Sequence, residues 1–338
     1  MQFINNLRGV AILLIVFTHA ISAVPQPGDV GYFLDYVLGN GTVVFMFIAG
    51  YLFSSTLDGY EYGPYLKNKF LSVILPYIFI ATPAILTYLI GIKNGHGWID
   101  LEWLRHNFNP VVQYFYILAM GAALGPLWFI PMVVLYFIAS PAFKFITRSN
   151  LLIPAILLTT IIAFIVGRPP GNSNPLQSFV FYLPSYLLGI ASHVHLQTLL
   201  KLKPISGWLL AGYLAIYIIF YFTVYDTTMV DGATSTMLFY LPLTVLLTVF
   251  FAQYLDRRNA ILDMFARLSF FIFFIHGYFS ALERAVLRRA GLITAIENPF
   301  IEVIVIIATF LAIIVMSLAV YVVLKLITRD KSRYIIGG

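Results

Sequence analysis

Charged side chains are scarce in this sequence of 338 residues, of which only 10% are Asp, Glu, Lys or Arg. Soluble domains carry roughly a quarter of charged residues. The hydrophobic share is 61% and the mean hydropathy is +0.91, which is more apolar surface than one or two soluble cores could bury. This composition excludes a water-soluble enzyme, a protein that binds nucleic acid and a disordered chain. It predicts an all-α integral membrane protein with many spans.

Cysteine is absent, which excludes a disulfide framework, a thiolate metal site and a cysteine nucleophile. His193 and His195 are spaced like a pair of metal ligands, but no nearby carboxylate or thiolate completes the set. The sequence also lacks a phosphate-binding loop, a nucleophile elbow and an HExxH helix. We therefore expect no metal and no bound cofactor.

Long apolar runs, bounded by charges or by Pro and Gly clusters, predict the membrane spans. Ten such runs are present: Leu7–Val24, Asn40–Leu57, Phe70–Ile92, Leu127–Ile146, Leu151–Val166, Leu176–His193, Gly207–Val224, Met237–Leu255, Phe265–Leu287 and Ile301–Ile327. An eleventh run, Pro110–Leu124, has only 15 residues and is more typical of a re-entrant or interfacial segment. The stretches between the runs are too short to fold alone, so we expect a single membrane domain over residues 1–338.

The distribution of Lys and Arg tests this span count. Ten spans with a cytoplasmic N-terminus place 14 basic residues on the cytoplasmic side and 6 on the outer side. This asymmetry follows the positive-inside rule. Counting Pro110–Leu124 as a further span would move the basic C-terminal tail to the outer side. The sequence therefore predicts about ten transmembrane helices with both termini in the cytoplasm.

Two ionisable residues of the first run, Arg8 and His19, are the most informative pair in the sequence. They are 11 residues apart, which on an α-helix is three turns plus about 20°, so both project from one face about 16 Å apart along the axis. Arg8 would then lie at the cytoplasmic interface and His19 near the middle of the bilayer. Buried ionisable groups in spans usually serve function. The alternative is that Arg8 is an ordinary interfacial anchor and His19 a hydrogen-bonded packing residue.

A series of motifs, in order along the chain, identifies a family resemblance. The first run has Leu-Arg-Gly at its start, with ten residues between Arg8 and His19, and the later motifs are Gly41–Leu52, Leu127–Phe129, Tyr182–Gly189 and Ser269–His276. Together they resemble the acyltransferase family 3 membrane proteins, which add O-acetyl or other short acyl groups to surface polysaccharides, lipopolysaccharide and related glycans. The resemblance implies ten spans and a multi-pass protein of the bacterial cytoplasmic (inner) membrane.

The resemblance also implies roles for individual residues. His19 and Arg8 would be catalytic, and Arg8, Lys67 and Lys69 would bind the acyl donor, acetyl-CoA or another acyl-CoA, from the cytoplasm. His19 would act as a general base or would carry the acyl group covalently, and the sequence leaves both mechanisms open. The acceptor would be a polysaccharide or a lipid-linked glycan that approaches from the outer side. Membrane lipid would surround the chain, and no nucleic acid partner is expected.

Two positions depart from the family pattern. Asn5 stands three residues before Arg8, where the family often has Asp. Lys69 begins a segment that in the family commonly reads Arg-x-x-Arg. A Lys attracts phosphate as a point charge but lacks the two-pronged contact of Arg. Both departures concern the region where the donor would bind.

Three further residues are candidates for lining a cavity or contacting the acceptor: Trp128, His276 and Arg168. Each has an ordinary alternative. Trp128 would be an interfacial anchor, His276 a structural hydrogen-bonding residue in the ninth run, and Arg168 a solvated charge of an outer loop.

A transporter or flippase of a lipid-linked glycan is the main alternative function, because it would also have many spans and buried polar residues. Transporters often show interrupted helices at matching positions of two halves. The prolines at positions 76, 83, 131, 141 and 184 have no counterparts in the last two runs. A non-catalytic scaffold is a third class, but it gives no reason for a face that carries both Arg8 and His19. Acyl transfer is favoured chiefly by the family resemblance and secondarily by the shared face of Arg8 and His19.

Overall fold

The computed structural model describes residues 1–225, 232–291 and 296–328, and every regular element in these ranges is helical. The helices that correspond to the ten apolar runs are α1 (Gln2–Ala23), α3 (Gly41–Ser55), α5 (Leu75–Leu89), α8 (Phe129–Ile138) with α9 (Ser140–Arg148), α10 (Leu152–Val166), α11 (Pro175–Val194), α13 (Ser206–Phe220), α14 (Gly232–Tyr254), α15 (Ala260–Arg289) and α16 (Pro299–Thr328). The shorter helices are α2 (Asp29–Leu38), α4 (Tyr62–Lys69), α6 (Leu101–Asn107), α7 (Pro110–Ala119) and α12 (Leu196–Leu199). The prediction of an all-α membrane protein is confirmed.

Seven helical segments of the described ranges are long and apolar enough to cross a membrane. An eighth is possible if α8 and α9, which are bent by 54° at their junction, form one span. The bend has a local cause, because Pro141 lies in the first turn of α9 and supplies no N–H to the preceding helix. α10, with 15 residues, is a shorter apolar helix. The count of ten spans and the cytoplasmic termini therefore stay predictions.

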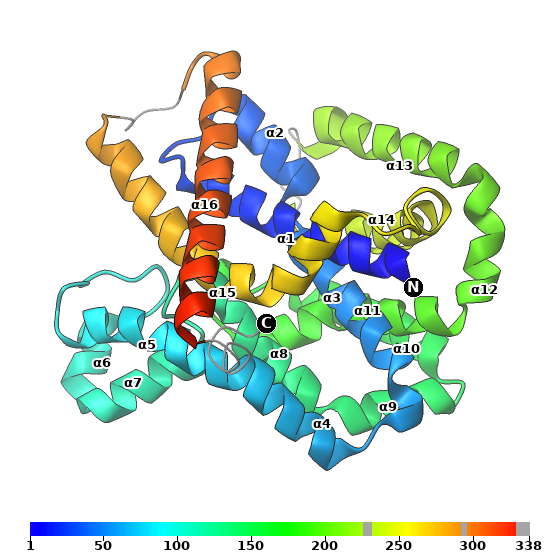
Figure 1. Cartoon of the computed structure of the whole chain (residues 1–338), viewed down its shortest axis with the longest axis horizontal. Coiled ribbons are helices and arrows are strands. Elements are labelled where there is room, and N and C mark those ends of the chain that lie inside the picture. Colours follow the sequence, from blue (N-terminus) through cyan, green and yellow to red (C-terminus); the bar gives the residue numbers. More distant parts are fainter. Residues whose placement is uncertain (226–231, 292–295, 329–338) are drawn as a thin grey trace.

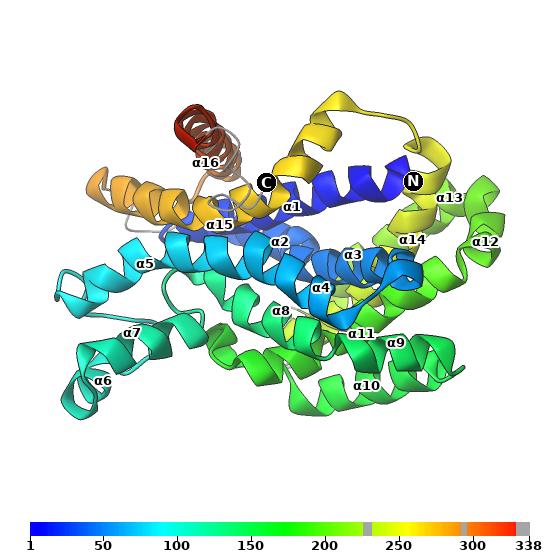
Figure 2. The same ribbon diagram turned by 60° about the horizontal axis from the view of Figure 1, so that its bottom comes forward.

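The eleventh apolar run folds into α7, a helix of 10 residues that ends at Ala119. α6 and α7 lie beside α5 at one end of the molecule (Figures 1 and 2). The Tyr77 hydroxyl of α5 donates to the Leu118 carbonyl at 2.5 Å, which fixes α7 on α5. A helix of this length rises about 15 Å, half the hydrocarbon thickness of a bilayer. Its length agrees with a segment that does not cross the membrane.

Side-chain caps mark where several helices begin. The Asn109, Asn174 and Asn259 side chains each accept two backbone N–H bonds, at the starts of α7, α11 and α15 respectively. Asp100 accepts one such bond at the start of α6. Proline follows Asn109 and Asn174 directly, at a position where a missing N–H costs nothing. Local sequence thus sets these boundaries.

α1 and α15 run in the same direction and pack closely against each other (Figure 1). In Figure 2, α1, α15 and α16 form the upper part of the molecule, α9 and α10 the lower part, and α3, α4 and α11 lie between them. Gly9 permits the closest approach of α1 to α15, because a Cβ at this position would overlap the Leu262 carbonyl oxygen. Because Gly9 has no side chain, the neighbouring Arg8 can lie against α15.

A pair of glycines brings α3 and α11 together in the same way. A Cβ at Gly50 would overlap the Tyr186 carbonyl, and a Cβ at Gly189 would overlap the Phe47 carbonyl. Both obstructions are backbone atoms, which cannot move aside as a side chain can. Small residues that let helix backbones approach are a common basis of helix packing in membranes. α3 carries part of the wall of the cavity described below, so this contact also shapes the site.

We expect Gly50→Val to separate α3 from α11 and to lower the free energy of unfolding by about 3 kcal/mol or more, the upper end of the cost of overpacking. Gly212→Val on α13 is the matched control, since a Cβ there meets nothing within 4 Å. Thermal unfolding of both variants in detergent, followed by the monodisperse fraction in size-exclusion chromatography, measures the difference. Equal stability of the two variants would contradict the close contact.

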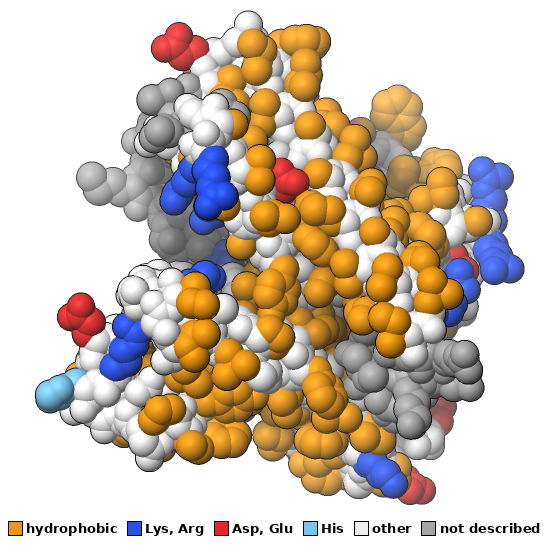
Figure 3. Space-filling model, turned by 60° about the vertical axis from the view of Figure 1, so that its left-hand side comes forward, with side chains coloured by type: hydrophobic (Ala, Val, Ile, Leu, Met, Phe, Trp, Pro, Cys, Tyr) orange, Lys and Arg blue, Asp and Glu red, His pale blue; other side chains and the backbone are white. Residues whose placement is uncertain are grey.

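The outward face of α16 is apolar, with large side chains such as Phe300, Val315 and Leu326 more than half exposed. Figure 3 shows apolar side chains covering most of this side of the molecule, with most charged side chains near its margins.

Glu302 of α16, in contrast to this exposed face, is buried with only 1% of its surface exposed. It accepts hydrogen bonds from the N–H groups of Gly28 and Gly31 at 2.5 and 3.0 Å. It thereby caps the start of α2, where a helix dipole favours negative charge.

Candidate functional site

Arg8 lies on the face of α1 that packs against α15. Its Nε donates to the Ser269 Oγ at 2.8 Å, and its guanidinium carbon lies 5.5 Å from the centre of the Phe270 ring. Ser269 is fully buried. One nitrogen is therefore used for positioning, and the terminal nitrogens of the guanidinium group make no hydrogen bond with the described residues. A cation held in this way can bind an anion through its terminal nitrogens.

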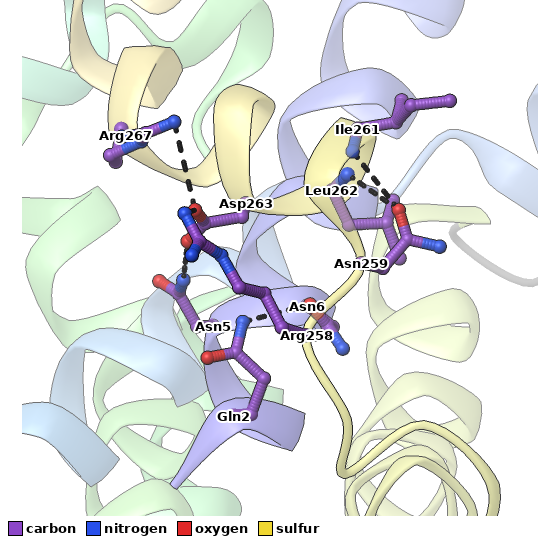
Figure 4. A network of polar contacts seen from close by, with 9 residues as sticks. All are labelled: Gln2, Asn5, Asn6, Arg258, Asn259, Ile261, Leu262, Asp263 and Arg267. Atoms are coloured by element: carbon purple, nitrogen blue, oxygen red, sulfur yellow. Dashed lines mark hydrogen bonds and ion pairs between the residues drawn. The ribbon is translucent and has the colours of Figure 1, made fainter.

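A polar network at the start of α1 fixes this helix relative to α15 (Figure 4). Asn5 donates to the Asp263 carboxylate at 2.8 Å, and Asn6 donates to the carbonyls of Leu255 and Arg257. Asp256 accepts the backbone N–H groups of Gln2 and Phe3 at the first turn of α1. The first of these contacts accounts for one departure from the family pattern, because an Asp at position 5 would place two carboxylates side by side.

A cavity of about 220 Å³ opens beside Arg8, between α1, α3, α4, α8, α11 and α15; we name it the Arg8–Lys69 cavity. Its lining is largely aromatic and aliphatic: Arg8, Phe45, Met46, Ile48, Ala49, Leu52, Phe53, Thr56, Tyr65, Lys69, Phe129, Val133, Tyr136, Phe137, Tyr186 and Phe270. The Lys69 Nζ lies 5.4 Å from the centre of the Tyr65 ring and 5.3 Å from that of Phe137. The cavity combines two cations with an apolar interior.

Lys67 is exposed and does not line the Arg8–Lys69 cavity. The reason is helical geometry, since residues two apart on α4 project about 200° from each other. Of the three residues expected to bind the donor, the structure therefore brings together Arg8 and Lys69 only.

His19 lies on the same face of α1 as Arg8, four residues before the last residue of the helix. It is therefore about 6 Å from that end, closer to it than the predicted position near the middle of the bilayer. Its ring centre is 4.9 Å from that of His276 on α15, at an interplanar angle of 52°. Its carbonyl accepts a bond from Ser280 at 3.2 Å. The structure thus places together two histidines that are 257 positions apart.

The tautomer of His276 follows from its contact with α15. Its Nδ1 lies 2.9 Å from the Ile272 carbonyl, which only accepts, so Nδ1 carries the proton. Nε2 of the neutral ring is then an acceptor, and this buried atom has no hydrogen-bond partner among the described residues. His276 itself is 0% exposed. A buried nitrogen with a free lone pair beside His19 is a group that can accept a proton or a hydrogen bond during a reaction.

Trp128 and Arg168 also come close to the histidine pair. A Cβ at Gly277, next to His276, would lie 2.8 Å from Pro126, which shows how closely the segment before Trp128 packs on α15. The Arg168 guanidinium lies 5.8 Å from the centre of the Trp128 ring and within electrostatic range of His19. The ring of Trp128 also stacks on Tyr182 at 5.8 Å. Trp128 is only 6% exposed, so it is a buried support for Arg168.

Phe273 separates the Arg8–Lys69 cavity from the two histidines. Its ring centre is 6.5 Å from Phe45 and 5.1 Å from Phe129, which both line the cavity, and 5.8 Å from His276. Neither His19 nor His276 lines the cavity. The Phe273 ring therefore lies between the aromatic wall of the cavity and His276.

The loop before α6 packs near Arg168 and is organised by His96. The His96 Nε2 donates to the Ala122 carbonyl at 2.8 Å, while Nδ1 accepts from the N–H groups of Trp98 and Ile99. These contacts need the neutral ring. Burial lowers the pKa of His96, the bond to Ala122 opposes that shift, and the charge of Lys93 adds to it. The Trp98 ring lies over Gly171, so the loop supports the segment that carries Arg168.

The described residues contain no group of three His, Cys, Asp or Glu side chains that could hold a metal ion. Of the pair His193 and His195, which has the spacing of metal ligands, the His193 Nδ1 shares a hydrogen bond with the Ser54 hydroxyl at 3.0 Å. Ser269 and Phe273 lie in the motif Ser269–His276, but no individual role for either residue is predicted from the sequence. Their signal is present in the sequence, because both are on the helix of His276, and Ser269 lies seven residues before it on the same face.

Residues 1–322 match the model of a protein family described as an acyltransferase domain. The match covers α1 to α15 completely and most of α16. No curated protein and no solved structure matches the chain.

Proposed function

Because the chain belongs to acyltransferase family 3, whose domain model matches residues 1–322, it is a membrane acyltransferase, and we propose that its donor is a cytoplasmic acyl-CoA and its acceptor a glycan hydroxyl. Acetyl is the proposed acyl group. The acceptor is a polysaccharide or a lipid-linked glycan on the outer side of a bacterial inner membrane. The observation that carries the proposal is the arrangement along α1, where a cationic cavity lies at Arg8 and a histidine pair at His19.

The Arg8–Lys69 cavity supports the donor part of the proposal. Acyl-CoA has phosphates at one end and a long, mostly uncharged pantetheine arm that ends in the thioester. Arg8 and Lys69 match the phosphates, and the aromatic lining matches the arm. Displacement of Phe273 would let the thioester pass from the cavity towards His19.

The histidine pair supports the transfer step. In the general-base mechanism His19 takes the proton of the acceptor hydroxyl as its oxygen attacks the thioester carbonyl. The C–S bond then breaks, the acyl group stays on the acceptor oxygen, and the CoA sulfur takes the proton from the imidazolium. The free Nε2 of His276 can stabilise the charged form of His19. A covalent acyl-histidine would use the same residues in two steps.

Arg168 supports the acceptor part of the proposal, because it lies near His19 and is held by Trp128 and by a bond of 2.7 Å to Asn172. Guanidinium groups bind hydroxyl and phosphate oxygens, and a lipid-linked glycan offers both. We propose that Arg168 orients the acceptor while Trp128 fixes Arg168 in place.

The acyl content of the surface glycan tests this function. Proton NMR before and after mild base treatment should show an acyl signal in wild-type cells, no signal in a deletion strain, and its return on complementation. Glycan export should be the same in all three strains. Acylation that survives the deletion while export stops would overturn the proposal in favour of a transporter or flippase.

A further inference from the structure

A second and larger cavity, of about 760 Å³, lies between α1, α15 and α16; we name it the α15–α16 cavity. Its lining contains the cations Arg8, Arg267 and Lys325, the aromatic ring of Tyr321, and aliphatic and methionine side chains of the two helices. None of its described lining residues is acidic. Its volume is within the range of pockets that hold cofactor-sized ligands. The smaller Arg8–Lys69 cavity is below that range.

The three cations of this cavity have few anionic partners among the described residues. Arg267 lies 3.6 Å from the Asp263 carboxylate, and Arg258 lies at the same distance from it, so two cations share one anion. The Lys325 ammonium lies 5.8 Å from the centre of the Tyr321 ring. Arg8 uses Nε for Ser269. Three cations within one apolar cavity favour a ligand that carries several negative charges.

Arg8 lines both cavities, and this is the observation that connects them. A ligand with a polyanionic end and a long uncharged end could occupy the two spaces at once, with its phosphates around Arg8. Acyl-CoA has this shape, since its adenine and three phosphate groups lie at one end and its pantetheine arm at the other. The Tyr321 ring offers a face for adenine, and base stacking on an aromatic side chain is favourable.

We propose that the α15–α16 cavity binds the adenosine 3′-phosphate 5′-diphosphate end of acyl-CoA, with Arg267 and Lys325 as phosphate contacts and Tyr321 against the adenine. The 5′-diphosphate then extends to Arg8 and Lys69, and the pantetheine arm continues into the aromatic part of the Arg8–Lys69 cavity. This inference rests on the proposed function, because it takes acyl-CoA as the donor. It adds α16 to the donor site and gives Arg8 the role of the junction between the two cavities.

Binding of CoA and of pantetheine to the full-length protein in phosphatidylcholine nanodiscs, measured by calorimetry, tests the inference. Arg267→Gln and Lys325→Gln should each weaken CoA binding by roughly 5- to 20-fold, the loss of one charge-assisted phosphate contact. Both should leave pantetheine binding unchanged, since pantetheine lacks the nucleotide. Arg258→Gln is the matched control, because Arg258 shares Asp263 with Arg267 but does not line the cavity, and CoA should bind it as tightly as wild type.

The outcomes separate the two proposals. Wild-type protein that binds no CoA contradicts the donor part of the proposed function and this inference with it. Wild-type protein that binds CoA, with equal affinity in the Arg267 and Lys325 variants, overturns this inference alone. Loss of tightly bound phospholipid from these variants at unchanged CoA affinity would assign the cavity to a lipid phosphate and also overturn it. If Arg258→Gln lost as much CoA affinity as Arg267→Gln, the loss would come from the changed surroundings of Asp263, which both arginines contact. This result would also overturn the inference.

Discussion

Replacing His19 with alanine is expected to lower kcat for acyl transfer by about 10²- to 10⁴-fold, the usual contribution of a positioned general acid–base group. The expectation follows from the geometry. His19 is the ionisable group of α1 nearest to Arg168 and His276, and no other described side chain of that helix near them can exchange a proton. The alternative, in which His19 is a packing residue, predicts lower stability and an unchanged kcat in the protein that remains folded.

Initial rates with purified protein, acyl-CoA and glycan acceptor measure this effect, normalised to the folded fraction. His106→Ala is the matched control, because His106 is exposed on α6 and should keep the wild-type rate. CoA binding should also stay unchanged in His19→Ala, since His19 lies outside both cavities. A kcat above a tenth of the wild-type value would remove His19 from the mechanism.

The helices of this fold are predictable because their apolar runs and caps are local. α1, α3 and α15 form where the sequence places apolar stretches, and Asn259 starts α15 through its own side chain. The shared face of Arg8 and His19 is likewise a property of one helix. Helix geometry also separates Lys67 from Lys69, so that difference could be predicted from the sequence alone.

The site itself depends on contacts between distant segments, which no local pattern specifies. The 4.9 Å approach of His19 to His276 requires that Gly9 let α1 meet α15, and the ring position of Phe273 depends on Phe45 and Phe129 from two other helices. The α15–α16 cavity is another such case, because its cations are ordinary basic residues of span ends when the sequence is considered alone. Only packing shows that they surround the space next to Arg8.

Replacing Arg8 is also expected to have a large effect on the rate with acyl-CoA, because Arg8 lines both cavities. Arg8→Gln should lower kcat/KM for acyl-CoA by roughly 100-fold, since it removes a half-buried cation at the place where the donor phosphates would pass. Arg8→Lys should lose roughly tenfold, because it keeps the charge but not the planar fork. Initial rates at varied acyl-CoA concentration measure both variants.

The comparison of donors decides what Arg8 does. An acyl-pantetheine has no nucleotide phosphates, so Arg8→Gln should lose much less activity with this donor than with acyl-CoA. Ser269→Ala is the control for positioning, as it removes the 2.8 Å bond to Nε and leaves the charge in place, and it should cost roughly threefold with acyl-CoA and less with acyl-pantetheine. If Arg8 were only an interfacial anchor, Arg8→Gln would leave both donors at the wild-type rate. If instead both donors lost activity equally, Arg8 would act on the helix contact with α15 and not on phosphate. A loss confined to acyl-CoA therefore identifies Arg8 as a phosphate-binding residue, independently of whether His19 acts as a base or carries the acyl group.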